Sequence, residues 1–303
     1  MYGRMWAEPL VPASLEYQAS DAREGGIILS EALPRINPIS PEYVTRKVFP
    51  AGDWALDEVT SSRAVVGNGQ RILWAKGETL FVVGDTGHGK STLTQNTTRA
   101  NIGLIPDILG FEAISFRSVL YIAADRPAQI KASLRRMVDD TNRQIWNGRV
   151  AVHEGPPGFA LNDEPFKFLP FIRELAERME REPFDCVICD SLKDMVSQMD
   201  ENTDGIHINQ ALQSVCQQDI QVLVDIHPRK MGSSRDKERS PVLDDVGGNK
   251  NITAGAGSVL YIGAPTEGSH PLYHLKSPSE RIEGLSIRYD NPTGNITYKE
   301  WGL

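Results

Sequence analysis

Residues 84–91, GDTGHGKS, have the residue types and spacing of a phosphate-binding loop, G-x-x-x-x-G-K-[ST]. Gly87 and Gly89 carry no Cβ, so backbone N–H groups can turn inward around a β-phosphate. Lys90 can reach the β- and γ-phosphates, and the Ser91 hydroxyl can coordinate Mg²⁺. We therefore predict that the chain binds ATP together with Mg²⁺.

The predicted nucleotide-binding stretch lies between an apolar strand-like run and a helix-like segment, so a helix would direct its positive end at the same phosphates. His88 occupies a variable position of the motif and is interpreted as a tolerated residue rather than a catalyst. The stretch comprises Gly84, Asp85, Thr86, Gly87, His88, Gly89, Lys90, Ser91 and Thr92.

Two carboxylates end apolar, strand-like runs. Asp190 ends FDCVICD, where a carboxylate can hold Mg²⁺ directly or through water. Asp125 ends SVLYIAAD, where it can polarise the water that attacks the γ-phosphate. Each has a structural alternative as a helix cap, and for Asp125 the helix would begin at Pro127, a residue that suits a first turn.

The elements that must position these groups alternate along the chain from about residue 70. Between the apolar runs lie helix-like segments at 90–103, 128–146, 166–181 and about 204–218. This alternation predicts an α/β fold with a mainly parallel sheet flanked by helices. The tail from residue 271 indicates short antiparallel strands at a sheet edge. The runs expected to form buried strands are TLFVVG, SVLYIAAD, RVAVHEG, FDCVICD, IQVLVDIH and GSVLYIGA.

Composition sets further limits. Residues 1–50 are rich in Pro, Ser, Glu and Ala and predict an N-terminal arm or small subdomain, before an ATPase domain at 51–303.

No apolar run of about 18 residues occurs, and the start lacks a signal-peptide pattern, so neither a membrane partner nor export is expected. Three cysteines suit a reducing cytoplasm. A net charge of −8 disfavours a broadly nucleic-acid-coated surface but permits a local basic lining.

These segments together resemble the RecA-like P-loop ATPases of the RepA- and DnaB-type hexameric replicative helicase family, over roughly residues 50–300. VLYIAADRP is similar to the family segment that carries the catalytic base, which implies that role for Asp125. The usual residue there is Glu, so this carboxylate is one methylene shorter. FDCVICDS resembles the Walker B strand and implies that Asp190 senses magnesium. QVLVDIHPRK resembles the strand that ends in a γ-phosphate sensor, which implies that role for His227.

The resemblance also implies a DNA-facing loop at residues 229–245, which has no apolar periodicity. Its cations are partly offset by Asp236 and Glu238 and can follow the phosphates of a single strand. A solvated surface loop is the structural alternative, although long loops in compact domains are uncommon without a function. The cations assigned to single-stranded DNA are Arg229, Lys230, Arg235, Lys237 and Arg239.

In the family, a lysine and an arginine near the C-terminal strands reach the ATP site of the next subunit. Lys276 stands at the lysine position of HLKSPSERIEG, whereas Pro278 stands where the arginine is usual, so Arg281 is the candidate replacement. Such a finger in trans stabilises transition-state charge and makes hydrolysis depend on assembly.

The leading hypothesis is a ring-forming ATP hydrolase, expected to be a hexamer, that acts as a helicase or translocase on single-stranded DNA in phage or plasmid replication. Lys90, Asp125, Asp190 and His227 would be catalytic, and replication proteins are further candidate partners. One alternative is a RecA-like recombinase or DNA-loading ATPase. Another is a regulatory assembly ATPase whose partner is a protein.

Overall fold

The computed structural model of the chain describes residues 50–56, 63–199, 201–229 and 239–300. The chain divides into two compact units, Met1–Glu58 and Val59–Leu303. In the first unit the described residues form helix α2, Ala51–Leu56. The predicted arm at residues 1–50 stays a prediction, because residues 1–49 lie outside the described part of the chain.

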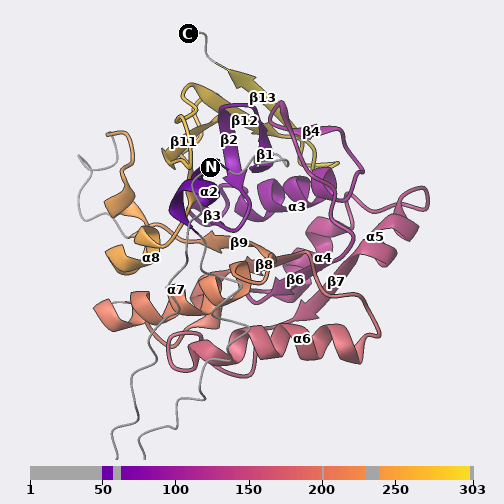
Figure 1. Cartoon of the computed structure of the whole chain (residues 1–303). Helices are drawn as coiled ribbons and strands as arrows, with labels where there is room; N and C mark the ends of the chain where they lie inside the picture. The colour runs from indigo at the N-terminus through magenta and orange to yellow at the C-terminus, as the bar shows by residue number, and fades with distance from the viewer. Residues whose placement is uncertain (1–49, 57–62, 200, 230–238, 301–303) are drawn as a thin grey trace, which may run out of the picture. The chain divides into compact units, whose positions relative to one another are not determined.

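The described residues of the second unit are built on a nine-stranded sheet with the order β13-β12-β11-β10-β3-β9-β8-β6-β7 (Figure 1). The six strands from β10 to β7 are parallel, and β11, β12 and β13 extend the sheet in antiparallel fashion. The predicted α/β core, with a mainly parallel sheet and antiparallel C-terminal strands, is confirmed. The strands are β3 Thr79–Gly84, β6 Val119–Ala123, β7 Val150–Glu154, β8 Cys186–Asp190, β9 Gln221–Ile226, β10 Ser258–Ile262, β11 His270–Lys276, β12 Leu285–Tyr289 and β13 Ile296–Glu300.

Helices cover both faces of this sheet, and alternate strand residues pack against each group. Phe81 of β3 belongs to the core under α6 and α7, whereas its neighbour Val82 belongs to the core under α3 and α4. Cys189 and Cys186 divide between the same two cores, as side chains three apart on a strand must. The helices are α3 Lys90–Asn101, α4 Pro127–Leu134, α5 Arg143–Arg149, α6 Phe168–Arg178, α7 Asn202–Cys216 and α8 Lys250–Ala254.

The single helix predicted at 128–146 is wrong, because the chain breaks between α4 and α5. Asp139 accepts hydrogen bonds from the backbone N–H and hydroxyl of Thr141 and from the N–H of Asn142. The Asn142 side chain in turn donates to the Met137 carbonyl at 2.9 Å. These local side-chain contacts compete with helical hydrogen bonds, which explains why the helix stops there.

A hairpin that the sequence analysis missed precedes the sheet. Strands β1, Ala64–Asn68, and β2, Arg71–Ala75, pair in antiparallel fashion. The two-residue turn between them is Gly69-Gln70, and Gly69 has a positive φ of 57°. A glycine at the first position of such a turn is a hairpin signal because the turn needs a left-handed residue there. No helix in the described residues is long and apolar enough to cross a membrane.

Candidate nucleotide site

The phosphate-binding loop connects the buried strand β3 to helix α3. Gly87 and Gly89 have φ angles of 85° and 86°, a left-handed conformation that glycine adopts without strain. The Gly89 carbonyl accepts the first helical bond from Leu93 N at 2.9 Å. The first turn of α3 holds no acidic side chain, so its positive end can attract an anion.

Lys90 is buried at the start of α3, with 7% of its surface exposed. Its Nζ donates to the carbonyl oxygens of Gly84 at 2.7 Å and Asp85 at 3.3 Å. Burial lowers the pKa of Lys90, and nearby carboxylates, led by Asp225, oppose that shift. An ammonium held only by carbonyls can exchange them for phosphate oxygens, which carry more charge.

Asp190, at the end of β8, is buried and lies beside the phosphate-binding loop. Tyr121 Oη donates to its Oδ2 at 2.7 Å, and Ser91 also hydrogen-bonds the carboxylate. Burial raises the pKa of Asp190, while these donors and Lys90 act in the opposite direction. The sequence analysis predicted both Asp190 and Ser91 as groups that hold Mg²⁺. It did not predict the hydrogen bond from Tyr121, because that residue comes from another strand, β6.

A second carboxyl group, Asp225 of β9, was also missed. It is fully buried, and Thr94 of α3 donates to its Oδ1 at 2.6 Å. Its Oδ2 is buried without a hydrogen-bond partner among the described residues, and the charge of Asp190 acts on this carboxyl group. Burial, followed by the charge of Asp190, raises the pKa of Asp225 well above its usual range. The sequence feature that could have indicated this residue is an Asp inside the otherwise apolar run IQVLVDIH.

Asp125 follows strand β6 and its backbone N–H donates to the Asp190 carbonyl at 3.1 Å. Arg126, not Asp125, is the N-cap residue of α4, and no side chain caps that helix. The capping alternative for Asp125 is therefore wrong. Its Oδ1 lies 3.4 Å from Nε of Arg126, and the Asp125 side chain is 32% exposed. The carboxylate is thus accessible to water at the edge of the site.

His227 follows directly after β9 and is half-buried. Burial lowers its pKa, and the positive charges of Lys90 and Lys193 lower it further, although Asp125 and Asp194 act against them. A neutral imidazole next to Lys90 can donate one hydrogen bond and accept another. This is the chemistry that a group reporting on a terminal phosphate requires.

A pocket of about 320 Å³ brings most of the predicted groups together. It also contains four polar residues that the sequence analysis missed on α4 and the turns at its ends: Arg126, Gln129, Ser133 and Arg136. Asp85 and His88 do not line this pocket; they line a separate one on another side of the loop. The predicted residues that do line it are Thr86, Gly87, Gly89, Lys90, Ser91, Thr92, Asp125, Asp190 and His227.

The oxygen donors suit Mg²⁺ bound together with a nucleotide. Among the described residues, no three His, Cys, Asp or Glu side chains form a group that could hold a metal by themselves. Ser91 and Asp190 offer one hydroxyl and one carboxylate, and Mg²⁺ commonly combines one or two such ligands with phosphate oxygens and water. These two residues would hold the ion.

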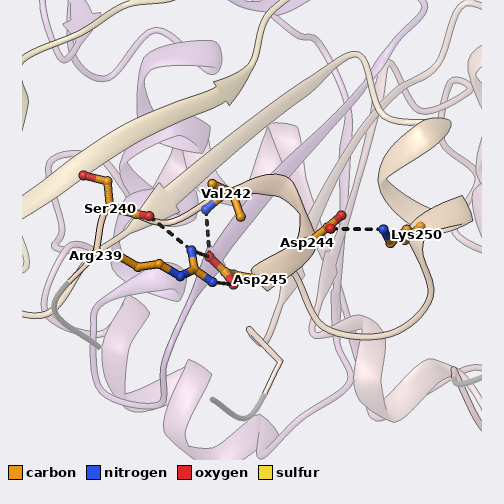
Figure 2. A network of polar contacts seen from close by, with 6 residues as sticks. All are labelled: Arg239, Ser240, Val242, Asp244, Asp245 and Lys250. Atoms are coloured by element: carbon orange, nitrogen blue, oxygen red, sulfur yellow. Dashed lines mark hydrogen bonds and ion pairs between the residues drawn. The ribbon is translucent and has the colours of Figure 1, made fainter. Parts of the chain in front are cut away.

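The basic segment, residues 229–245, follows β9, and the structure describes Arg229 at its start and residues 239–245 at its end. Arg229 is exposed and donates to the Gly248 carbonyl at 2.8 Å. Arg239 makes a two-pronged ion pair with the buried Asp245, at 2.7 and 2.5 Å (Figure 2). Val242 N donates to the same carboxylate at 2.8 Å, so the pair closes a short turn. The predicted DNA contacts Lys230, Arg235 and Lys237 lie outside the described residues.

Lys276 and Arg281 do not join this pocket. Lys276 pairs with Val259 near the start of β10, whereas the phosphate-binding loop follows the opposite end of β3. Val259 in turn pairs with Phe81, three residues before Gly84, so Lys276 lies about 10 Å along the strands from the start of the loop. Lys276 Nζ donates to the carbonyls of Thr253 and Ala254 at 3.1 and 2.9 Å, at the end of α8. Arg281 is exposed in the segment that follows. Neither is placed to act on the nucleotide of its own subunit.

A match to one protein-family profile agrees with a nucleotide site. The profile of the AAA domain family matches residues 47–233, which is more than half of the chain. Among solved structures, a KaiC-like protein from the hyperthermophilic archaeon Pyrococcus horikoshii OT3 is 12% identical with a TM-score of 0.48. That match covers 74% of this chain and 90% of the other. No curated protein matches this sequence significantly.

Proposed function

We propose a function for this chain, which belongs to the AAA domain family and is a P-loop ATPase. The chain assembles into a ring, and the ring uses ATP hydrolysis to move along single-stranded DNA. In this proposal it serves as a helicase or translocase in phage or plasmid replication. ATP would bind at the pocket that contains Lys90, Asp125 and Asp190.

The side chains of the pocket have distinct chemical tasks. Lys90 would hold the β- and γ-phosphates and oppose the negative charge that develops during transfer. Asp125, accessible to water, would accept a proton from the attacking water. His227 would hydrogen-bond the γ-phosphate as a neutral ring. Mg²⁺, when bound through Ser91 and Asp190, would supply charge neutralisation at the phosphates.

One structural relationship carries the proposed coupling to DNA. Strand β9 delivers His227 to the nucleotide pocket and, two residues later, Arg229 to the adjoining pocket that also contains Arg239. Loss of the γ-phosphate would remove a partner of His227 and thereby alter the start of the basic segment. Switching loops in other ATPases and GTPases respond to the γ-phosphate in this way.

The location of Lys276 and Arg281 supports an assembly. Their sheet edge is opposite the phosphate-binding loop, so a contribution to hydrolysis requires a neighbouring copy. Head-to-tail interfaces of this kind generate closed rings when the rotation closes. In the proposed ring, one copy supplies the nucleotide pocket and the next copy supplies the cation.

The test is the rate of ATP hydrolysis with and without a single-stranded oligonucleotide, on protein imaged by electron microscopy with a magnesium–ATP analogue. The proposal predicts closed rings and DNA-stimulated turnover. DNA-coated filaments of variable length would instead favour the recombinase alternative. Turnover that single-stranded DNA leaves unchanged would contradict the proposal and favour a regulatory ATPase with a protein partner.

A further inference from the structure

Two pockets adjoin on the surface beside the antiparallel strands. One, of about 680 Å³, lies between the phosphate-binding loop and the basic segment, where Asp85, His88 and Arg229 contribute to its wall. The other, of about 510 Å³, lies over β11, β12 and β13. Thr266, Pro271 and Tyr273 line both, so the two form a continuous surface that we term the tyrosine groove.

Two aromatic rings lie at the centre of the tyrosine groove. Tyr261 of β10 and Tyr273 of β11 are directly opposed across the antiparallel pair, so they project from the same face of the sheet. Tyr261 is buried, with 7% of its surface exposed, and it belongs to the core against which Tyr273 packs. Tyr273 is half-buried and lines both pockets. It therefore offers a ring surface for contact with a planar ligand.

Cations flank these rings from three separate parts of the chain. Arg229 and Arg239 come from the basic segment, Arg288 from β12 and Lys299 from β13, and all four are exposed.

Asp85 and Glu267 are the carboxylates in the lining, and Asp245 pairs with Arg239 from behind it. In a chain of net charge −8, this surface is locally richer in cations than in carboxylates.

The register of the strands places the second group of cations on the face that carries Tyr273. Pro271 pairs with Ser286 and Ser286 pairs with Lys299, so these positions share one side of the sheet. Arg288 lies two residues beyond Ser286 and therefore projects from that side as well. Tyr298, which pairs with Ile287, also borders this pocket, and its hydroxyl lies close to Gly110.

We propose that the tyrosine groove binds single-stranded DNA, with a base stacked on Tyr273 and phosphates contacted by Arg229, Arg239, Arg288 and Lys299. Rings that stack bases beside cations that follow the backbone are the chemistry by which proteins bind single strands without sequence preference. This inference rests on the proposed function and names the DNA surface. DNA bound in the groove would also contact Asp85 and His88, which belong to the phosphate-binding loop but do not line the nucleotide pocket.

The experiment measures the affinity of oligodeoxythymidine, and of the same strand with abasic sites, for the full chain with a magnesium–ATP analogue. Tyr273→Leu should weaken binding of the thymidine strand by about tenfold, because stacking of one base contributes about 1–3 kcal/mol. The same variant should bind the abasic strand nearly as well as the unchanged protein does. Phe166→Leu is the matched control, since it removes an exposed ring that lines neither pocket of the groove, and it should bind both strands normally.

A second pair of variants tests the phosphate contacts. Arg288→Gln with Lys299→Gln should reduce the salt slope of the affinity by about 1.4, because each single-strand phosphate contact contributes about 0.7. Arg173→Gln with Arg178→Gln, on α6, removes the same charge elsewhere and should leave the slope unchanged. ATP affinity should stay constant in every variant.

The outcomes separate the two proposals. A chain that binds neither strand and shows no DNA-stimulated hydrolysis would overturn both. A chain that responds to DNA, but in which Tyr273→Leu and the β12–β13 pair bind like the unchanged protein, would overturn the tyrosine groove alone. Loss of thymidine binding without loss of abasic binding in Tyr273→Leu would support it.

Discussion

The ring of Tyr289 packs against Gly89 of the phosphate-binding loop. A Cβ placed on Gly89 would lie 2.3 Å from Cζ of Tyr289, far inside van der Waals contact. Tyr289 also meets His270 edge to face, with ring centroids 5.3 Å apart. The antiparallel part of the sheet therefore contacts the phosphate-binding loop through Tyr289. Gly89 is required there both for its left-handed backbone and for the close approach of the Tyr289 ring.

Gly89→Ala should accordingly destabilise the protein more than Gly87→Ala. Both glycines have left-handed φ, but a Cβ on Gly87 would meet nothing within 4 Å. The backbone effect, about 1–2 kcal/mol, is common to both variants. Overpacking against Tyr289 should add about 1–3 kcal/mol in Gly89→Ala alone. Urea unfolding measures the difference, and Tyr289→Leu should reduce it. Equal losses of stability in the two variants would contradict the contact.

Lys90→Ala should weaken ATP binding at least tenfold, since a charge-assisted hydrogen bond contributes about 1.5–3 kcal/mol. The measurement is titration with a fluorescent ATP analogue in the presence of Mg²⁺. Lys131→Ala removes an exposed lysine from α4 and serves as the control, with unchanged affinity expected. Normal ATP binding by Lys90→Ala would remove the basis for the nucleotide site.

Asp125→Asn should bind ATP normally but hydrolyse it about 10²- to 10⁴-fold more slowly, because the amide cannot accept the proton of the attacking water. Asp125→Glu keeps the base and should retain hydrolysis. Single-turnover rates together with ATP affinities distinguish the chemical step from binding. An Asp125→Asn variant with an unaltered single-turnover rate would exclude Asp125 as the base.

Mixing two inactive variants tests whether Lys276 acts in trans. Lys90→Ala lacks a working pocket, and Lys276→Ala lacks the cation offered to its neighbour. In rings mixed randomly at equal amounts, about a quarter of the interfaces should combine an intact pocket with an intact lysine. The mixture should therefore regain ATPase activity that neither variant has alone. Full activity of Lys276→Ala by itself would show that this lysine is not required.

The buried His274 predicts a stability that falls in mild acid. Ile282 N donates to its Nδ1 at 3.4 Å, and Nε2 lies 2.9 Å from the Ser258 hydroxyl, an arrangement that suits a neutral ring. Burial and then the charge of Arg281 lower the pKa of His274 to about 4. Because the unfolded chain has the higher pKa, the contribution is complete above about pH 6.5 and is lost as pH falls towards 4.

The free energy of unfolding should thus decrease by about 2 kcal/mol from pH 7 to pH 5 through this one group. Urea unfolding across that range measures the slope. His274→Asn, which cannot titrate, should flatten the pH dependence relative to the unchanged protein. An identical slope in both proteins would show that His274 does not titrate between the folded and unfolded states in this way.

The chemistry of the nucleotide site could be predicted because its main parts are local in the chain. The spacing from Gly84 to Ser91 specifies a tight glycine turn and a helix start, whatever lies around them. Asp125 and Asp190 could be placed because the ends of adjacent parallel strands meet at one sheet edge. The apolar runs likewise predicted the parallel strands, since buried strands are apolar on both faces.

Contacts between distant segments could not be obtained in that way. Whether Asp225 faces Asp190, whether Tyr289 supports Gly89 and whether Tyr273 joins cations from β12 and β13 all depend on strand order and register. Periodicity specifies which side chains share a face of one strand, but not which strand becomes its neighbour. The phosphate-binding loop follows from covalent spacing, whereas its supporting ring and the tyrosine groove arise only when the sheet assembles.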